Sequence, residues 1–219
     1  MRMFNAEWEV VRDFEHDSPI TDLQFSLDGR ALPEDHGLTL FDAIRPLLPW
    51  LGDAPGTGIH PVTAPASGRD DASLVLNRRS KLLLRIPTAR LDDARKLSGT
   101  TIDPGCGEIR IGTAKPKPLV PFGTLYTPLL ALDTDDEIAF MQRVEAILTE
   151  LGIRETTLLC GKRRTIRAPE GQLTGFSLMI HNLSMPDSLT VQTTGMGRDH
   201  GLGCGLFVPH KSIKEVAID

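Results

Sequence analysis

The sequence predicts an α+β fold made of two tandem ferredoxin-like units, each with the RRM-like order β-α-β-β-α-β. Apolar and polar residues alternate in several short segments, as in half-buried strands, and apolar residues recur at helical spacing in two longer segments. The second half repeats the order of the first, and the helical stops Leu51-Gly52 and Leu151-Gly152 match. We expect one unit with an acidic leader over residues 1–118 and a second over 119–219. A single α+β domain without duplication is the alternative.

The first unit is predicted to open with a strand at residues 20–27, which ends at the turn Asp28-Gly29. A helix follows, with Asp35 as its N-cap and apolar residues as far as Leu51. Pro46 and Pro49 predict that this helix kinks or ends early, because proline removes a helical hydrogen bond and clashes with the preceding turn. The later elements are strands at 73–76 and 81–86, a short helix at 88–97, a strand at 108–112 and an extended linker at 115–118.

The second unit shows the same order of patterns. Residues 133–136 form a capping run before a helix whose apolar stripe extends to Leu151. The other expected elements are strands at 125–132, 156–160 and 176–180, a weakly patterned segment at 188–193 and a final strand at 206–208.

Composition excludes several classes of protein. The chain has 219 residues, 40% of them hydrophobic and 24% charged, which is ordinary for a soluble globular protein. The three cysteines form no Cys-x-x-Cys pair, so a zinc ribbon, a thioredoxin motif and a secreted disulfide framework are not predicted. There is no run of eighteen apolar residues, and the N-terminus carries acids where a signal peptide is apolar. We expect a cytoplasmic protein without a membrane partner.

Charge is distributed in blocks along the chain. The net charge of −5 argues against a protein that wraps bulk nucleic acid. Residues 1–60 carry −7, residues 61–120 carry +5, residues 121–150 carry −5 and residues 151–219 carry +2. If the two positive blocks share a face, an acidic protein can still hold a local basic groove.

The strongest local signal is a glycine-rich loop at residues 195–205, with glycine at positions 195, 197, 201, 203 and 205. A dinucleotide fingerprint is disfavoured because only fourteen residues follow and the next segment is strand-like, and no P-loop motif is present. We interpret the loop as a backbone that approaches a phosphate closely through its amides, with donors beside it from Arg198, His200, His210 and Lys211. A glycine-rich turn before the last strand is the structural alternative.

A late glycine-rich loop before a final strand, in a chain of duplicated ferredoxin-like units, resembles the CRISPR repeat-RNA endoribonucleases of the Cas6 family in the RAMP superfamily. The resemblance rests on three segments, residues 33–38, 159–164 and 201–211, which look like a compact subtype of that family. Asp199 departs from the pattern, since relatives often carry a more basic loop.

The resemblance implies an endoribonuclease that cuts the repeat transcript, the pre-crRNA, once per repeat to make guide crRNAs, without metal or other cofactor. In the reaction that it implies, the 2′-hydroxyl attacks the adjacent phosphorus and leaves a 2′,3′-cyclic phosphate and a 5′-hydroxyl. The implied partners are repeat RNA and, beyond it, other subunits of a CRISPR effector complex.

His36 is the residue on which the resemblance places the general base, because the family takes this base from a histidine near the first helix. Its polar neighbours predict exposure, and the positive end of a helix dipole favours a neutral imidazole that can accept a proton. His60 and His200 are the second and third candidates. No His-Glu-x-x-His motif or His/Cys cluster predicts a catalytic metal.

The densest basic run, Lys162-Arg163-Arg164, is predicted to bind RNA, since the arginine fork suits phosphate and stacks on bases. Arg78, Arg79 and Lys81 hold a comparable position in the first unit. The complete set of predicted RNA contacts is Lys162, Arg163, Arg164, Arg198, His200, Lys211, Gly195, Gly197, Gly201, Gly203 and Gly205.

Two alternative functions remain open at this point. One is a non-cleaving RNA-binding subunit of a CRISPR effector complex, and the other is a small α+β protein whose glycine loop holds a phosphate or a nucleotide. Neither the general acid nor the repeat that is recognised can be assigned from the sequence.

Overall fold

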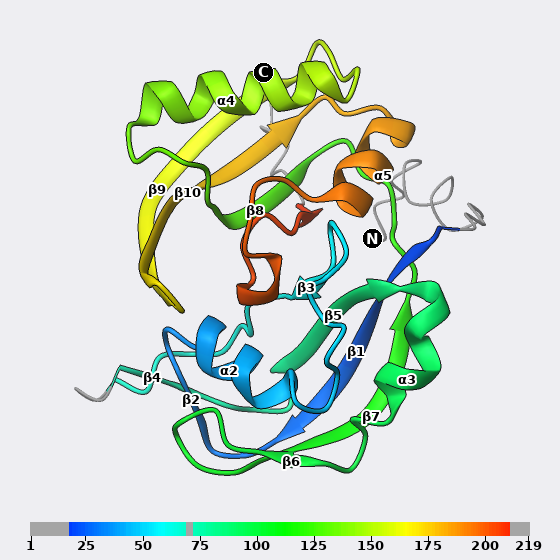
Figure 1. The fold of residues 1–219 in the computed structure, drawn as a ribbon, viewed down its shortest axis with the longest axis vertical. Helices are drawn as coiled ribbons and strands as arrows, with labels where there is room; N and C mark the ends of the chain where they lie inside the picture. The colour runs from blue at the N-terminus through cyan, green and yellow to red at the C-terminus, as the bar shows by residue number, and fades with distance from the viewer. Residues whose placement is uncertain (1–17, 69–71, 211–219) are drawn as a thin grey trace, which may run out of the picture.

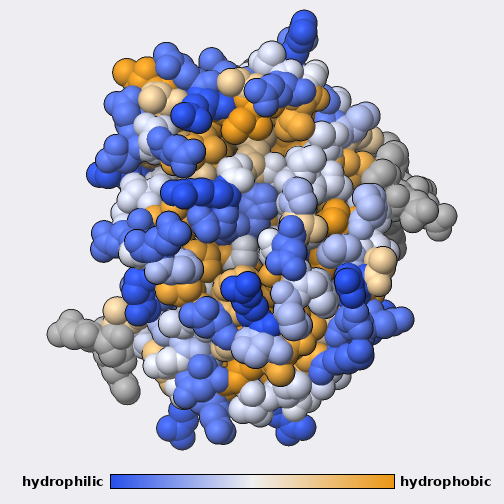
Figure 2. Space-filling view, viewed as in Figure 1, coloured by the Kyte–Doolittle hydropathy of each residue, from blue (hydrophilic) through white to orange (hydrophobic). Residues whose placement is uncertain are grey.

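The computed structural model describes residues 18–68 and 72–210, which form two α+β units, one above the other in Figure 1. Each unit is an antiparallel sheet with helices on one face. Most of the molecular face in Figure 2 is hydrophilic, with smaller hydrophobic areas between the polar side chains.

The N-terminal unit extends to Lys117. Its elements are β1 (Ile20–Asp28), β2 (Ala31–Pro33), α2 (Gly37–Ile44), β3 (Gly58–Ile59), β4 (Ser73–Val75), β5 (Lys81–Pro87), the 3-10 helix η1 (Thr88–Arg90), α3 (Leu91–Arg95), β6 (Thr101–Ile102) and β7 (Ile109–Lys117).

The C-terminal unit follows a short connection. Its elements are β8 (Leu125–Leu130), α4 (Glu137–Glu150), β9 (Thr157–Ala168), β10 (Gly171–His181), α5 (Met185–Thr194), the 3-10 helix η2 (His200–Leu202) and β11 (Val208–Pro209).

The two sheets have the same topology. The N-terminal sheet has the order β3-β5-β1-β7-β6 and the C-terminal sheet the order β11-β8-β10-β9. Four strands of each sheet correspond, and in chain order they are β1, β3, β5 and β7 in the N-terminal unit and β8, β9, β10 and β11 in the C-terminal unit. Numbered 1 to 4 along the chain, they lie in the spatial order 4-1-3-2 of a ferredoxin-like fold in both sheets, and all pairs are antiparallel. The predicted fold class is confirmed.

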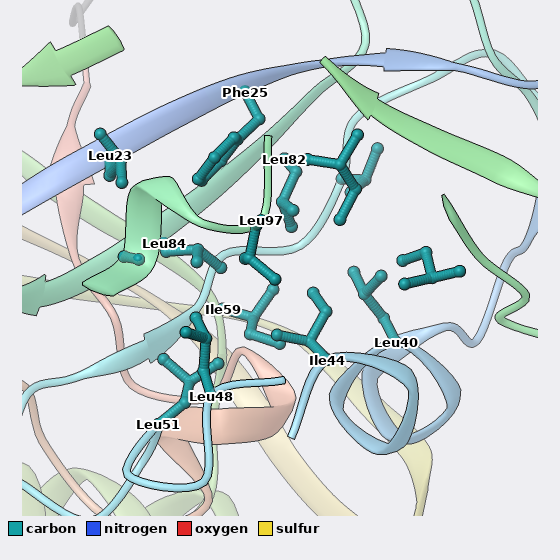
Figure 3. Close-up of a cluster of buried hydrophobic side chains, with 14 of the residues drawn as sticks. Leu23, Phe25, Leu40, Ile44, Leu48, Leu51, Ile59, Leu82, Leu84 and Leu97 are labelled. Atoms are coloured by element: carbon teal, nitrogen blue, oxygen red, sulfur yellow. The ribbon is translucent and has the colours of Figure 1, made fainter. Parts of the chain in front are cut away.

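The core of the N-terminal unit lies between its sheet and α2. Leu23 and Phe25 project from β1 toward Leu40 and Ile44 of α2, as Figure 3 shows. Arg45 is the C-cap of α2, so the helix ends directly before Pro46, as the two prolines predict. The apolar residues after that end, Leu48 and Leu51, stay buried in turns, and for this reason the sequence pattern extends beyond the helix.

Two predicted elements are wrong, and a third lies in another sheet. The strand predicted at 73–76 is present as β4, but it pairs with β2 in a separate two-stranded sheet, and the two-residue β3 lies beside β5 instead. The expected linker at 115–118 is the end of β7, because Lys115 and Lys117 pair with β1. The weakly patterned segment at 188–193 belongs to α5, which Ser184 caps by accepting a hydrogen bond from Asp187 N.

β9 is much longer than the predicted strand at 156–160, and it contains a bulge. Arg163 pairs with Phe176 and Cys160 pairs with Leu178, so Gly161 and Lys162 together stand opposite one residue, Ser177. A Cβ at position 161 would overlap the Ser177 hydroxyl, so a larger residue there would require that hydroxyl to move. The extra residue reverses which side chains face α4 along the second half of β9.

One buried side chain joins the two units. Arg85 of β5 has no exposed surface, and its guanidinium holds both carboxylate oxygens of Asp22 on β1, at 2.9 and 3.1 Å. Its Nη1 also donates to the carbonyls of Gln192 in α5 and Phe207 before β11, at 3.0 and 2.8 Å. Gln192 lies in the last turn of α5, where helix carbonyls lack partners and the helix dipole favours a cation.

We predict that Arg85→Ala lowers the free energy of unfolding by about 3–5 kcal/mol, because it leaves the Asp22 carboxylate buried without its partner. Arg95→Ala is the matched control: Arg95 pairs with Asp92 at the surface, and its loss is expected to change stability by less than about 0.5 kcal/mol. Urea unfolding followed by circular dichroism measures both. Equal effects in the two variants would contradict a special role for Arg85.

Candidate functional site

A cavity of about 800 Å³ lies between the two sheets. Leu23 and Phe25 of β1 point into the helix-side core, so Gln24 between them points the other way, and it lines this cavity. Tyr126 and Pro128 of β8 line it from the other unit. The cavity therefore lies between the sheet faces that carry no helices.

The polar side chains of the cavity fit an anionic ligand. Its titratable and charged side chains are one carboxylate, one phenol, two imidazoles and three cations: Glu34, Tyr126, His36, His60, Arg79, Lys81 and Arg164. Three cations against one carboxylate give a cavity that attracts negative charge in a protein whose net charge is −5.

His36 is the N-cap residue of α2, at the predicted helix start, but it is buried rather than exposed as predicted. Its Nε2 accepts from Val62 N at 2.9 Å, so the proton resides on Nδ1, which donates to the Pro33 carbonyl at 3.0 Å. Burial lowers the pKa of His36 below its usual 6.5, against smaller opposing effects of Pro33, Glu34 and Asp35. The ring is a neutral imidazole with both nitrogens already bonded to the backbone.

Asp35 is not the helix cap that the sequence predicts. Its Oδ2 accepts from the backbone N and from Nε of Arg167 on β9, at 2.8 and 3.3 Å. Arg167 also donates to the carbonyl of Asp35 at 3.0 Å. Because β9 belongs to the other unit, Asp35 holds the two units together beside the cavity.

His60 follows β3 and lies against the Arg85–Asp22 pair. Its Nε2 is 3.5 Å from Oδ1 of Asp22, and only 7% of its side chain is exposed. The pKa of His60 is lowered by burial and by the nearby Arg85 charge, while Asp22 opposes the shift. Burial raises the pKa of Asp22, but Arg85 and His60 together lower it far more, so Asp22 stays ionised.

The basic run is divided between the two faces of β9. Arg163 pairs with the core residue Phe176 and therefore faces the α4 side, where it binds Asp135 at 2.8 Å. Arg164 points the other way and lines the cavity together with His36. Lys162 lies in the bulge and is exposed.

The glycine-rich loop packs between the units instead of opening to solvent. Gly195, Gly201, Gly203 and Gly205 are buried, and Gly197 alone among the five is exposed. Gly203 has a φ of +90°, and a Cβ there would lie 2.9 Å from the Pro61 ring in the N-terminal unit. The density of glycines is therefore explained by close packing, and a phosphate clamp would be limited to the exposed part of the loop.

His200 fastens this loop to the N-terminal unit. Its Nδ1 accepts from Gly56 N at 3.0 Å, so its Nε2 donates to the Met196 carbonyl at 3.1 Å. Together with Gly197 and Arg198 it lines a second cavity of about 600 Å³, which carries fewer cationic groups than the first. Lys211 lies outside the described residues.

Sequence reasoning missed Tyr126, which lines the main cavity, and the Asp22–Arg85 pair, which lies against the cavity residue His60. Arg85 is a charge inside the apolar run at 82–86, and such a residue must find a buried partner. Tyr126 alternates with Leu125 and Thr127, and this places its ring on the open sheet face. Asp22 has no comparable sequence signal.

Within residues 18–68 and 72–210, no group of three or more His, Cys, Asp or Glu side chains is placed to hold a metal ion. No helix among them is both long and apolar enough to cross a membrane.

Comparison with known proteins identifies the family. The family model described as Cas6 Crispr matches residues 21–212. This chain belongs to the Cas6 family. A relative from Myxococcus xanthus, named CRISPR-associated endonuclease Cas6, is 31% identical over 189 residues, which cover 86% of this chain and 80% of the relative.

Solved structures show the same fold in more distant Cas6 and RAMP proteins. A structure titled "An RAMP protein binding different RNA substrates" has a TM-score of 0.64 at 13% identity and covers 87% of this chain and 100% of its own. A structure titled "CRISPR associated protein Cas6" has a TM-score of 0.58 at 13% identity and covers 88% and 100%. These similarities support the fold class of this Cas6 family member.

We predict that the stability of this Cas6 protein declines as pH falls below about 6.5. The folded state lowers the pKa of His36, His60 and His200, mainly through burial, so the unfolded chain binds protons first. The stabilisation is complete above pH 6.5 and is lost as pH falls toward the folded pKa values, by up to about 1.4 kcal/mol per pH unit for each histidine. Urea unfolding between pH 8 and pH 5 measures this, and His36→Gln is expected to make the dependence shallower. An unchanged slope in that variant would contradict the prediction.

Proposed function

We propose that this protein is a metal-independent endoribonuclease that binds CRISPR repeat RNA and cleaves pre-crRNA to make guide crRNAs. The observation that carries the proposal is the cavity between the sheets, where two neutral histidines meet three cations. Membership of the Cas6 family and the endonuclease name of the Myxococcus xanthus relative support it.

The proposed reaction is transesterification within the RNA. A base removes the proton of the 2′-hydroxyl beside the scissile bond, and the oxygen attacks the adjacent phosphorus. The products carry a 2′,3′-cyclic phosphate and a 5′-hydroxyl. A neutral imidazole can accept a proton near neutral pH, and preorganised cations stabilise charge that develops on the phosphate. Arg79, Lys81 and Arg164 line the same cavity as the two histidines.

The proposed partner is repeat RNA, in the cytoplasm where transcripts are made, with subunits of a CRISPR effector complex as further partners. Arg164 is the residue of the basic run that lines the cavity. Lys162, Arg163, Arg198, His200, Lys211 and the loop glycines remain predicted RNA contacts. The RNA-binding RAMP protein of the same fold supports RNA as the ligand.

His36 remains the base that the sequence predicts. It lines the cavity and its pKa is lowered, as a neutral base requires. In the observed geometry its Nε2 lone pair is engaged by Val62 N, so this role requires that the Val62 contact open when RNA binds.

We predict that excess chelator leaves the cleavage rate of cognate repeat RNA unchanged, because the attacking oxygen belongs to the RNA. Replacing the 2′-hydroxyl at the cleavage site by hydrogen is expected to abolish cleavage while binding persists. Gel analysis of cleavage products and a filter-binding assay measure the two effects. Cleavage of the deoxy substrate would overturn the mechanism, and binding without any cleavage would favour a non-cleaving RNA-binding subunit.

We predict that Arg164→Ala weakens repeat binding and reduces the slope of log affinity against log salt by about 0.7 to 0.9, as expected for one lost phosphate contact. Arg163→Ala is the matched comparison, because Arg163 faces α4 and pairs with Asp135. It is expected to change the slope less. Titration of labelled repeat RNA at several salt concentrations tests this, and an unchanged slope in Arg164→Ala would place Arg164 away from the RNA.

A further inference from the structure

An apolar row crosses the open face of the C-terminal sheet. In the register of the strands, four side chains are successive neighbours: Val208, Tyr126, Met179 and Leu159. The residues beside them on β8 and β10 pack into the helix-side core, so this row points away from the helices. Val208 and Tyr126 line the main cavity, whereas Leu159 on the outer strand β9 is 53% exposed. The row therefore extends from the cavity to the edge of the sheet.

His210 packs against the ring of Tyr126. The two ring centroids are 5.6 Å apart and the planes are tilted by 56°. The backbone N of His210 donates to the carbonyl of Thr124 at 3.0 Å, which ties the chain after β11 to the start of β8. The tyrosine ring is thus positioned before any ligand arrives, and binding to it costs little conformational entropy.

A second row lies on the open face of the N-terminal sheet. Gln24 of β1 pairs with Leu83 of β5 on one side and with Lys115 of β7 on the other, so the three side chains are neighbours across the sheet. Gln24 and Leu83 line the main cavity, and Lys115 is exposed. Lys115 therefore adds a cation next to the cavity, in a segment from which the sequence predicts only a linker.

The cations on these faces have no acidic partner. Within residues 18–68 and 72–210, no ion pair involves Arg79, Lys81, Lys115 or Arg164. By contrast, Arg167 of β9 is paired with an aspartate. A cation without a partner keeps its charge available for a ligand, so these faces attract a polyanion.

Unpaired RNA presents the two kinds of surface that these faces match. Its bases offer flat apolar faces, which stack on aromatic and apolar side chains, and its phosphates bind cations. Duplex RNA keeps the faces of its bases inside its own stack, so it has no use for the apolar row. A protein partner would cover the row too, but the cations without acidic partners favour RNA.

We propose that the two open sheet faces bind an unpaired segment of the repeat RNA, and this inference rests on the proposed endoribonuclease function. One base stacks on Tyr126, and a neighbouring base lies toward Leu159. The amide of Gln24, which can both donate and accept, bonds to the edge of the stacked base. Lys115 binds a phosphate of the same segment. Together these contacts fix the RNA relative to His36, which lines the same cavity.

The decisive experiment is a double-mutant cycle between Tyr126→Ala and cognate repeat RNAs that each carry one abasic nucleotide. We expect Tyr126→Ala to weaken binding of the intact repeat by about 5- to 150-fold, the usual effect of losing one stacked base. One abasic position is expected to weaken wild-type binding by a similar factor and Tyr126→Ala by less than about twofold more. Filter binding measures all four affinities.

Two further variants complete the cycle. Tyr126→Phe keeps a ring that can stack, and it is expected to retain most of the affinity. Ile138→Ala alters an exposed apolar residue of α4 outside both cavities and is the unaffected control. If Tyr126→Ala does not fold by circular dichroism, Tyr126→Leu replaces it, because leucine keeps an apolar side chain but removes the ring.

Each outcome of the cycle bears on the proposal. Losses that add at every abasic position would show that no base stacks on Tyr126, and the proposal would fail. Unchanged RNA binding in both Tyr126→Ala and Leu159→Ser would assign the apolar row to a protein partner and would also overturn it. Wild-type binding and cleavage are measured first. A wild type that neither binds nor cuts refutes the proposed function itself, whereas a wild type that does both leaves only the stacking site in question.

Lys115→Ala tests the basic end of the site. We expect it to reduce the slope of log affinity against log salt by about 0.7, the value for one phosphate contact on a single strand. Lys96→Ala is the matched control, because Lys96 is exposed beside α3 and pairs with Asp93. Pairing the unpaired segment with a complementary oligonucleotide is expected to remove the difference between Lys115→Ala and wild type. Equal slopes for Lys115→Ala and wild type on the free repeat would place Lys115 outside the RNA site.

Discussion

The buried guanidinium of Arg85 is the constraint on which the arrangement of the two units depends. A cation without solvent contact must place its donors on acceptors, and Arg85 finds them on Asp22, Gln192 and Phe207. Two of these acceptors belong to the C-terminal unit. The sheets therefore cannot slide against each other without leaving a buried charge unpaired, so the cavity between them has a defined shape.

The same ion pair connects structure with chemistry. Asp22 uses both carboxylate oxygens on Arg85, and Oδ1 also faces Nε2 of His60. Burial and the nearby Arg85 charge keep the imidazole neutral, and the Asp22 carboxylate lies 3.5 Å from its Nε2. Because Arg85 is also bonded to α5 and to the segment before β11, the histidine is correctly held only when both units are in contact. Asp35 and Arg167 reinforce the contact near His36.

The sequence was sufficient to predict what depends on local pattern. Alternation and helical spacing predict the repeated order of elements, and Pro46 predicts where α2 ends. Features set by pairing between distant segments could not be found in this way. The bulge at Gly161 depends on Ser177, and it decides that Arg164 rather than Arg163 faces the cavity. The burial of His36 is likewise set by Val62, a contact between a helix start and a loop that no local pattern specifies.

The glycine motifs of the two halves have one physical cause, which neither half shows alone. A Cβ at Gly58 would overlap the carbonyl oxygen of His200, and one at Gly37 would lie 2.6 Å from that of Leu202. These glycines of the N-terminal unit lie against the same stretch of the glycine-rich loop that brings Gly203 against Pro61. Glycine is needed on both sides because two backbones meet where side chains would normally separate them. This close contact brings the segment after β3, and with it His60, next to the C-terminal unit. The loop therefore contributes to the candidate site mainly through the histidine that it helps to position.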